Sequence, residues 1–392
     1  MDACNDVAVS DTPPRPGDES SMVPGEPRRR RLLAVSHPSV VSVNQEVYLE
    51  LKRRGWEVSV VVPAHWRHEY SPGLVEPQVL EGMESSLLPR RVIMPGRPQR
   101  HLYLTRCTDL CRRLRPDVAF VEGEAYSLAA SQWRLAFNRA GVPFGVQCAE
   151  NIDRSLPAPV RALRSRVLRD AAFVAARSET AAELARSWGA RGDVRLAPHA
   201  VPDWDSVPES SEHPFTIGYA GRLVESKGLK DLLEAVRHLE APVELLLIGD
   251  GEQRGELEGQ SIPGSRVKVL DDVSHAEMAG AYARLDVVAL PSHTTPTWKE
   301  QFGRVIVEAL WCGVPVVGSD SGEIPWLIGL TGGGLVFPEG DSGALADRLE
   351  QLRRSPELRR ELAGNGRAVV ERMFTVPAAT DPFEAMLSAA AG

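Results

Sequence analysis

Two glutamates flank a glycine turn in the segment EQFGRVIVE at residues 300–308. The pattern predicts a helix that begins near Phe302 and Gly303. Because Gly303 has no side chain, a phosphate can approach the amides of the first helical turn closely. Glu308 lies further along this helix, where its carboxylate can accept hydrogen bonds from a diol such as ribose. Glu300, in the preceding loop, can reach another part of the same ligand. The segment therefore predicts a nucleotide-sugar site, and the alternative is two ordinary helix charges.

Two cations lie five residues apart in the segment GRLVESKG, which begins at Gly221 and contains Arg222 and Lys227. The segment follows a predicted strand and precedes a predicted helix, and in open α/β sheets such loops bind ligands. An arginine binds phosphate bidentately and a lysine acts as a point charge, so the pair suits a diphosphate. Two solvated surface cations are the alternative, and this loop alone does not decide between them.

A dinucleotide site is a competing interpretation of the segment IGDGEQRGEL, in which Gly249 and Gly251 follow a predicted strand. The dinucleotide fingerprint needs a third glycine where the helix packs closely against the strand. Arg254 occupies that place. The sequence therefore argues against NAD binding.

Short apolar runs alternate with helix-period segments along the chain, a pattern typical of parallel sheets covered by helices. The fold that we predict is α/β, with two Rossmann-like domains whose parallel sheets face each other across a cleft. The expected divisions are a disordered leader at 1–30, an acceptor-binding domain at 31–200, a linker at 201–214, a nucleotide-sugar-binding domain at 215–373, and a C-terminal helix at 374–392 that returns toward the first domain.

Four motifs of the second half, taken together, resemble family 4 glycosyltransferases, which are retaining enzymes of the GT-B fold. The motifs are G-R-x4-K-G at 221–228, G-D-G at 249–251, E-x7-E at 300–308 and GVPVVGSDSGEIP at 313–325. They occur in the order and spacing of that family throughout the second domain, whereas the first domain matches only in architecture.

The resemblance implies a role for each matching residue. Arg222 and Lys227 would hold the diphosphate of the donor, and the amides of Phe302 and Gly303 its distal phosphate. Glu308 would bind the ribose hydroxyls and Glu300 the transferred sugar. The family requires no metal for donor binding, so the resemblance implies no cofactor besides the nucleotide-sugar substrate.

The acceptor side departs from the family pattern. Many relatives begin with a glycine-rich loop, where this chain has SHPSVVSVN, and many carry a histidine where Ala149 stands. Polar residues at the ends of predicted strands could line the acceptor side, although each is as compatible with a structural role: His37, Glu122, Glu124, Glu150 and Asn151. His65 and His68 are three residues apart without a third ligand, so we expect surface histidines and no metal site.

Composition limits the other possibilities. A formal net charge of -8 argues against general nucleic-acid binding. The five scattered cysteines show neither zinc nor disulfide spacing, which favours a cytoplasmic protein. No stretch approaches the ~20 apolar residues of a membrane-spanning helix. The basic run at Arg28–Arg31 would allow at most a weak peripheral contact with anionic lipid.

We therefore expect a retaining hexosyltransferase that uses a nucleoside-diphosphate sugar. The acceptor would be a hydroxyl group of a natural-product aglycone or of a glycan. The alternatives are a GT-B nucleotide-sugar epimerase, a phosphorylase, for which the sequence offers no pyridoxal or phosphate site, and a catalytically silent nucleotide-sugar-binding protein.

Overall fold

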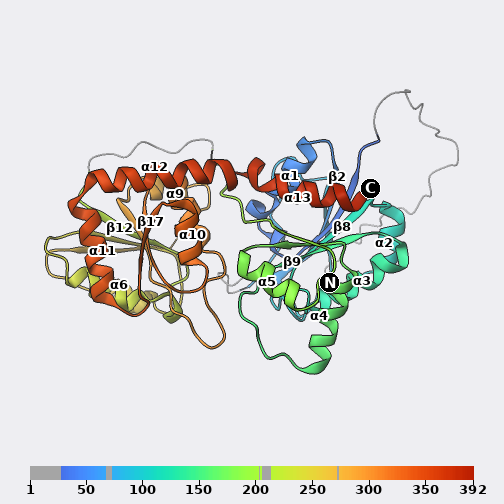
Figure 1. Cartoon of the computed structure of the whole chain (residues 1–392), viewed down its shortest axis with the longest axis horizontal. Coiled ribbons are helices and arrows are strands. Elements are labelled where there is room, and N and C mark those ends of the chain that lie inside the picture. Colours follow the sequence, from blue (N-terminus) through green and yellow to red (C-terminus); the bar gives the residue numbers. More distant parts are fainter. Residues whose placement is uncertain (1–27, 68–72, 203, 205–212, 272) are drawn as a thin grey trace, which may run out of the picture.

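The chain forms two α/β units that lie side by side in the computed structural model (Figure 1). The structure describes residues 28–67, 73–202, 204, 213–271 and 273–392. Most of the leader and of the linker expected from the sequence, and also His68, lie outside the described residues.

The first unit contains a parallel sheet with the strand order β11-β10-β9-β8-β1-β2-β5. Its strands are rich in β-branched and aromatic residues on both faces, as expected for a sheet covered on both sides. Their bounds are β1 (Arg31–Ser36), β2 (Glu57–Pro63), β5 (Leu87–Arg90), β8 (Val118–Glu122), β9 (Phe144–Cys148), β10 (Phe173–Ala176) and β11 (Asp193–Leu196). Two short antiparallel pairs stand apart from the sheet: β3 (Trp66–Arg67) with β4 (Leu74–Val75), and β6 (Val92–Ile93) with β7 (Leu102–Tyr103).

Helices connect these strands, and capping residues mark where some of the helices begin and end. Ser127 and Ser178 accept hydrogen bonds from amides of the first turns of α3 and α5, which satisfies donors that a helix leaves free. Gly141 ends α3 with a φ of 68°. The bounds are η1 (Pro38–Val40), η2 (Ser42–Gln45), α1 (Glu46–Arg53), α2 (Cys107–Leu114), α3 (Leu128–Ala140), α4 (Ala158–Asp170) and α5 (Glu179–Ser187).

The second unit contains a parallel sheet with the strand order β14-β13-β12-β15-β16-β17. The strands are β12 (Thr216–Ala220), β13 (Glu244–Ile248), β14 (Arg266–Leu270), β15 (Val287–Leu290), β16 (Val316–Ser319) and β17 (Gly334–Phe337). The helices are η3 (Glu225–Lys227), α6 (Leu229–Arg237), α7 (Arg254–Glu258), α8 (Met278–Tyr282), α9 (Arg304–Trp311), α10 (Ile324–Thr331), α11 (Ser342–Arg354) and α12 (Pro356–Met373).

The last helix, α13 (Val376–Ala391), leaves the second unit and packs on the first, where it lies beside α1 in Figure 1. The ring of Phe383 lies 4.7 Å from that of Phe120 on β8. Arg54 forms ion pairs with Asp381 at 2.7 Å and with Glu384 at 2.8 Å. The helix therefore completes the core of a domain that begins more than three hundred residues earlier.

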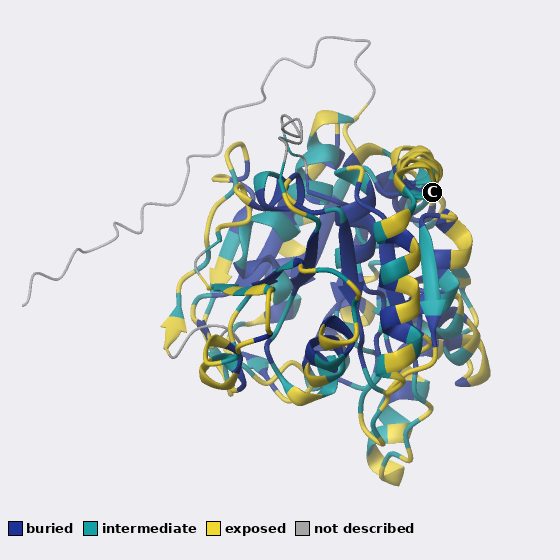
Figure 2. Ribbon diagram, turned by 90° about the vertical axis from the view of Figure 1, so that its left-hand side faces the viewer, coloured by how far each residue is buried: buried dark blue, intermediate teal, exposed yellow. Residues whose placement is uncertain are grey.

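Each sheet is buried between helices, so its central strands are dark blue in Figure 2, while edge strands and the outer helix faces are partly exposed. One face of the first sheet packs on α2 to α5 around Trp133, and its other face packs on α1 and α13 around Phe120. The second unit has one continuous core. The predicted α/β fold with two parallel sheets is confirmed.

Candidate functional site

The strand order of the second sheet reverses between β12 and β15, and the loops that follow these two strands meet there. A crevice at the carboxyl ends of strands forms at such a reversal. Gly228, with a φ of 66°, lets the loops touch, because a β-carbon there would lie only 1.9 Å from the carbonyl oxygen of Pro291. The amide of His293 donates to the carbonyl of Ser226 at 2.8 Å, which fixes the contact.

Lys227 and Glu300, predicted from separate motifs, meet at this crevice. The Lys227 Nζ lies 2.6 Å from Glu300 Oε2, and the hydroxyl of Ser292 donates to the same oxygen at 3.1 Å. Only 15% of the Lys227 side chain and 12% of the Glu300 side chain are exposed, so the ion pair is shielded from solvent. The Lys227 ammonium also lies 4.5 Å from the ring centroid of Trp298.

The helix predicted after Gly303 is α9, and Gly303 precedes it with a φ of 71°. No side chain caps its first turn; the Ile306 amide donates to the Gly303 carbonyl at 2.8 Å, and the amides before it can accept an anion. Phe302 is buried, with its ring 5.4 Å from that of His199 and 6.0 Å from that of Phe374. Its side chain thus anchors the turn where the two units join.

Glu308 is buried on α9 and held by two groups. The hydroxyl of Tyr282 donates to its Oε2 at 2.9 Å, and the Arg304 Nε lies 2.9 Å from its Oε1. Burial raises the pKa of Glu308, while the charge of Arg304 acts in the opposite direction. Arg304 also places its Nη2 3.1 Å from the Nε2 of His275. The carboxylate is therefore positioned and partly neutralised by neighbours that the motif did not indicate.

Arg222 is half-buried in the loop after β12. The hydroxyl of Tyr219 donates to the Arg222 carbonyl at 2.6 Å, which fixes the backbone of this loop. Gly221 has a φ of 146°, and a β-carbon there would lie 2.9 Å from the Tyr219 hydroxyl oxygen. Gly221 therefore allows the close turn that carries Arg222 toward the crevice side of the sheet.

His37, at the end of β1, lies within an aromatic cluster. Its ring centroid is 5.2 Å from that of Trp66 and 5.4 Å from that of His101. Burial and the neighbouring His101 lower the pKa of His37 to about 3, so the ring is neutral at physiological pH.

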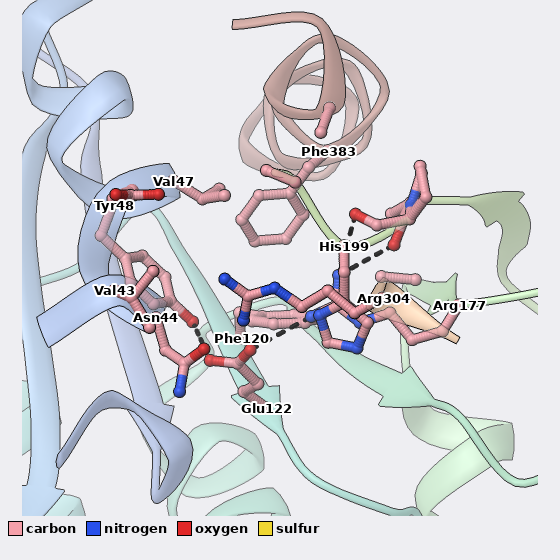
Figure 3. Close-up of a pocket in the computed structure, with 16 residues that line it drawn as sticks. Val43, Asn44, Val47, Tyr48, Phe120, Glu122, Arg177, His199, Arg304 and Phe383 are labelled. Carbon is pink, nitrogen blue, oxygen red and sulfur yellow. Dashed lines mark hydrogen bonds and ion pairs between the residues drawn. The ribbon is translucent and has the colours of Figure 1, made fainter. Parts of the chain in front are cut away.

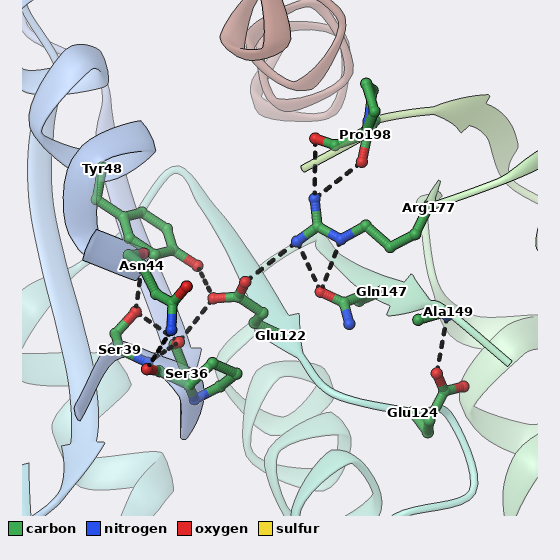
Figure 4. A network of polar contacts seen from close by, with 12 residues as sticks. Ser36, Ser39, Asn44, Tyr48, Glu122, Glu124, Gln147, Ala149, Arg177 and Pro198 are labelled. Carbon is green, nitrogen blue, oxygen red and sulfur yellow. Dashed lines mark hydrogen bonds and ion pairs between the residues drawn. The ribbon is translucent and has the colours of Figure 1, made fainter. Parts of the chain in front are cut away.

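Glu122, at the end of β8, is the centre of a polar network (Figure 4). Its Oε2 accepts hydrogen bonds from Ser36 Oγ at 2.6 Å and from the Tyr48 hydroxyl at 2.8 Å. Arg177 places its Nη2 3.1 Å from Oε1, and it also donates to Gln147 Oε1. Both carboxylate oxygens of Glu122 are thus engaged by the first domain itself.

A pocket between the two units lies beside this network (Figure 3). Arg304 reaches into it from the second unit, and Glu122, Arg177 and His199 line it from the first unit and the connection. Its remaining lining comes from η2, α1, α13, the strands β8 and β10, and the connection that follows β11.

Of the predicted acceptor-side residues after β9, Asn151 contacts the second unit. Asn151 Nδ2 donates to the carbonyl of Glu300 at 2.7 Å, and the amide of Glu323 donates to the same carbonyl at 3.0 Å. Glu150 is buried one residue earlier, where Arg154 Nε lies 2.8 Å from it and the Tyr126 hydroxyl 3.1 Å. The end of β9 therefore touches the segment that carries Glu300.

Among the described residues, no group of three histidine, cysteine or acidic side chains could hold a metal ion. His65 is exposed and lies 3.7 Å from Glu76. None of the described helices combines the length and the apolar character that crossing a membrane requires. Within the basic run, Arg28 pairs with Asp117 and Arg31 with Glu57.

Sequence reasoning did not identify several residues that complete the site. Ser292 and Trp298 support Lys227 and Glu300, and Tyr282 and Arg304 support Glu308. Ser292 and Trp298 lie in the loop just before E-x7-E, and Arg304 lies inside this motif, so their closeness in sequence to the motif could have indicated them. No sequence signal indicated Tyr282, because its contact with Glu308 spans 26 residues.

Comparison with known proteins identifies both halves of the chain. A family model described as glycosyl transferases group 1 matches residues 201–369, and one described as a glycosyl transferase 4-like domain matches residues 40–199. Two solved structures share the fold. Sucrose-phosphate synthase from Thermosynechococcus elongatus has a TM-score of 0.67 at 17% identity, covering 92% of this chain and 99% of that one. Anabaena HepE in complex with UDP has a TM-score of 0.68 at 17% identity, covering 92% and 100%.

Curated relatives match over shorter stretches. The capsular polysaccharide biosynthesis glycosyltransferase CapM of Staphylococcus aureus is 29% identical over 181 residues, 44% of this chain and 45% of CapM. A D-inositol 3-phosphate glycosyltransferase of Xylanimonas cellulosilytica is 32% identical over 227 residues, 51% of this chain and 53% of that protein. The chain thus spans about half the length of these two relatives. A 2-deoxystreptamine N-acetyl-D-glucosaminyltransferase of Streptomyces fradiae is 27% identical over 273 residues, 62% of this chain and 64% of the relative. With both of its domains matched by the family models, the chain belongs to the family 4 glycosyltransferases of the GT-B fold.

Proposed function

We propose that this chain transfers a hexose-type sugar from a nucleoside-diphosphate sugar to a hydroxyl acceptor, with retention of the anomeric configuration. One observation carries the proposal. Lys227 and Glu300 form a shielded ion pair at the reversal of the second sheet, beside the uncapped first turn of α9. A cation, anion-accepting amides and a carboxylate at one crevice match the phosphates and the hydroxyls of such a donor.

Each donor-side residue then has a separate task. Lys227 and Arg222 would bind the diphosphate and stabilise the negative charge that grows on it as the sugar departs. The amides at Phe302 and Gly303 would bind the distal phosphate. Glu300 would exchange part of its contact with Lys227 for sugar hydroxyls, and Glu308 would accept hydrogen bonds from the ribose.

Cationic groups at this crevice support donor binding without a metal, because they supply the positive charge that a divalent ion supplies elsewhere. Retention is supported by the family resemblance of the E-x7-E segment. A covalent intermediate is not part of the proposal, because Glu300 and Glu308 are already bound to Lys227 and to Tyr282 and Arg304.

The names of the relatives support a polyhydroxylated acceptor. They include transferases named for inositol 3-phosphate and for 2-deoxystreptamine, and one named for capsular polysaccharide biosynthesis. We therefore propose a hydroxyl group of a small natural-product aglycone or of a glycan as the acceptor.

A ligand panel tests the proposal in two steps. Thermal shift with nucleoside diphosphates identifies the base, and release of the nucleoside diphosphate from matching sugar donors is then measured with a panel of cyclitols and glycans. Proton NMR of the anomeric coupling in the product reports its configuration. Donor binding with acceptor-dependent release and a retained linkage supports the proposal. Absence of nucleotide binding, or an inverted linkage, refutes it.

A further inference from the structure

The segment 90–115 of the first domain is strongly basic, although the formal net charge of the chain is -8. It contains eight arginines and one acidic residue, Asp109. All of these arginines except Arg90 are exposed. Asp109 pairs with Arg112 at 3.7 Å, and the other exposed arginines of the segment form no ion pair with a described residue. A large positive charge therefore remains uncompensated on this part of the surface.

The hairpin of β6 and β7, within this segment, turns an apolar face outward. Ile93 pairs directly with Leu102, and neighbouring residues of a strand point to opposite faces. Because Tyr103 is buried, Ile93 and Leu102 face away from the core. The Leu104 amide donates to the Arg91 carbonyl at 2.8 Å, which extends the pairing and puts Leu104 on the same outer side. We call Ile93, Leu102 and Leu104 the hairpin face.

Exposed apolar side chains are concentrated around this hairpin. Of the seven large apolar side chains that are exposed among the described residues, four belong to this region: Ile93, Met94, Leu104 and Leu135. Leu135, on α3, lines a groove together with Arg106 and Arg139, so apolar and basic groups adjoin there. Met94 has a φ of 54°, which costs free energy for a residue with a side chain, and backbone strain of this kind is concentrated at functional segments.

The loop at residues 94–101, which joins the two strands, is held in place by the rest of the domain. The Leu128 amide donates to the Gln99 carbonyl at 2.9 Å. The ring of His101 lies 5.4 Å from that of His37, which follows the end of β1. The hairpin is therefore fixed beside the carboxyl end of the first sheet, the end at which Asn151 contacts the second unit.

We propose that the hairpin face and the exposed arginines around it dock the protein onto an anionic lipid bilayer. At a membrane interface, apolar side chains enter the boundary between headgroups and acyl chains, and basic side chains bind the lipid phosphates. Both kinds of group occur together on this surface. Docking would bring the carboxyl end of the first sheet close to the lipid. The inference goes beyond the proposed function and does not depend on it.

The pattern of charge and apolar area favours a bilayer over other partners. Nucleic acid would pair with the arginines but would leave the hairpin face in water, and the net charge of the chain would repel it. A protein partner would need an acidic surface with an apolar centre of matching shape. An anionic bilayer needs no such match, because its surface charge is uniform and its interior is deformable. A second copy of this acidic chain is the remaining alternative, and the test includes it.

Co-sedimentation with vesicles tests the role of the arginines. The wild-type chain should sediment with vesicles of phosphatidylcholine mixed with phosphatidylglycerol, and it should stay in solution with phosphatidylcholine alone. Arg97→Ala combined with Arg100→Ala should weaken partitioning roughly 25-fold, because each arginine near an anionic surface contributes about fivefold. The control is Arg191→Ala combined with Arg284→Ala, which removes the same charge from exposed positions outside the segment and should bind like wild type.

Leu104→Ser tests the apolar part of the surface. It should weaken partitioning on the order of tenfold at low and at high salt, whereas high salt should remove the effect of the arginine changes. The control is Leu330→Ser, which changes an exposed leucine on α10 of the second domain. Every variant should unfold at the wild-type temperature, because each changed side chain is exposed.

The inference is overturned if the wild-type chain does not sediment with the anionic vesicles, or if the variant of Arg97 and Arg100 sediments as the wild type does. Wild-type partitioning of Leu104→Ser also overturns it, because the hairpin face would then not enter the bilayer. Sedimentation velocity without vesicles decides the alternative: self-association of the wild type that the arginine variant loses would assign the surface to a second copy. Nucleotide binding by the wild type tests the proposed function separately.

Discussion

A buried carboxylate should reduce the stability of the protein at neutral pH, and Glu124, in the loop after β8, allows this to be measured. The perturbation is Glu124→Gln, which keeps the size of the side chain and removes its charge. The glutamine carbonyl can still accept the hydrogen bond from the Ala149 amide that now binds Oε1. The comparison therefore isolates the ionisation of this group.

The magnitude follows from the pKa of Glu124, which folding raises from 4.5 to about 7. The difference of about 2.5 corresponds to ~3.5 kcal/mol, at ~1.4 kcal/mol for each pKa unit. Because Glu124 as a whole residue is only partly buried, we expect a measured effect of ~2 to 3 kcal/mol.

The sign follows from proton linkage. Between pH 4.5 and about 7 the folded state binds this proton and the unfolded state releases it. The contribution of Glu124 to stability is therefore fully present below pH 4.5 and is lost as the pH rises through about 7. Relative to wild type, Glu124→Gln should gain stability as the pH increases, and the gain should level off above about pH 8.

Urea unfolding of both proteins at pH 5.5 and at pH 8 measures this difference, and taking the variant minus wild type removes the contribution of every other titrating group. The control is Glu183→Gln, which changes an exposed glutamate on α5 and should show no pH-dependent difference in stability from wild type. A difference between variant and wild type that is the same at both pH values would refute the reasoning, whatever its size, because it would show that Glu124 has an ordinary pKa.

Three further predictions concern the donor side. Lys227→Ala and Arg222→Ala should each reduce turnover on the order of 10²-fold, because each loses a charge that stabilises the departing diphosphate; Lys230→Ala, an exposed lysine on α6, is the control, and near-normal activity in either folded variant contradicts the assignment. Calorimetry with the nucleoside diphosphate should show weaker binding for Glu308→Gln, whereas Glu300→Gln should mainly slow transfer; the opposite order reverses the ribose and sugar assignments. Turnover should survive EDTA, and a loss that magnesium or manganese restores would replace the metal-free proposal.

Most of the sheet strands were predictable because their burial on both faces requires continuous apolar runs. VELLLIGDG contains β13 and EVSVVVP is β2. The edge strand β5 was not predicted, because it is only four residues long and contains Pro89. The two short pairs, β3 with β4 and β6 with β7, are set by tertiary contacts and have no periodicity of their own.

Some residues of the candidate site were predictable from the sequence and others were not. Lys227, Gly303 and Glu308 lie in short contiguous motifs whose spacing carries information. The supports of these residues come from distant segments, as with Tyr282, which reaches Glu308 from α8. The raised pKa of Glu124 depends on the burial of its side chain, and this property exists only after the chain has folded.

The return of α13 onto the first domain has a consequence for protein engineering. The amide of Val201 donates to the carbonyl of Phe374 at 2.7 Å, so the outgoing and the returning chain segments cross between the domains side by side. Phe383, Met386 and Leu387 then fill the core against the first sheet. The first domain is therefore discontinuous in sequence, although it is continuous in space.

Chimaeras that exchange the first domain between related transferases thus need two junctions, one near residue 200 and one near residue 374. A single junction at the linker would join a foreign first domain to a native α13, so the contact of Phe383 with Phe120 and the ion pairs of Arg54 would be mismatched. For the same reason, the first domain expressed alone would expose an apolar face of its sheet, unless the terminal helix is supplied as a second fragment.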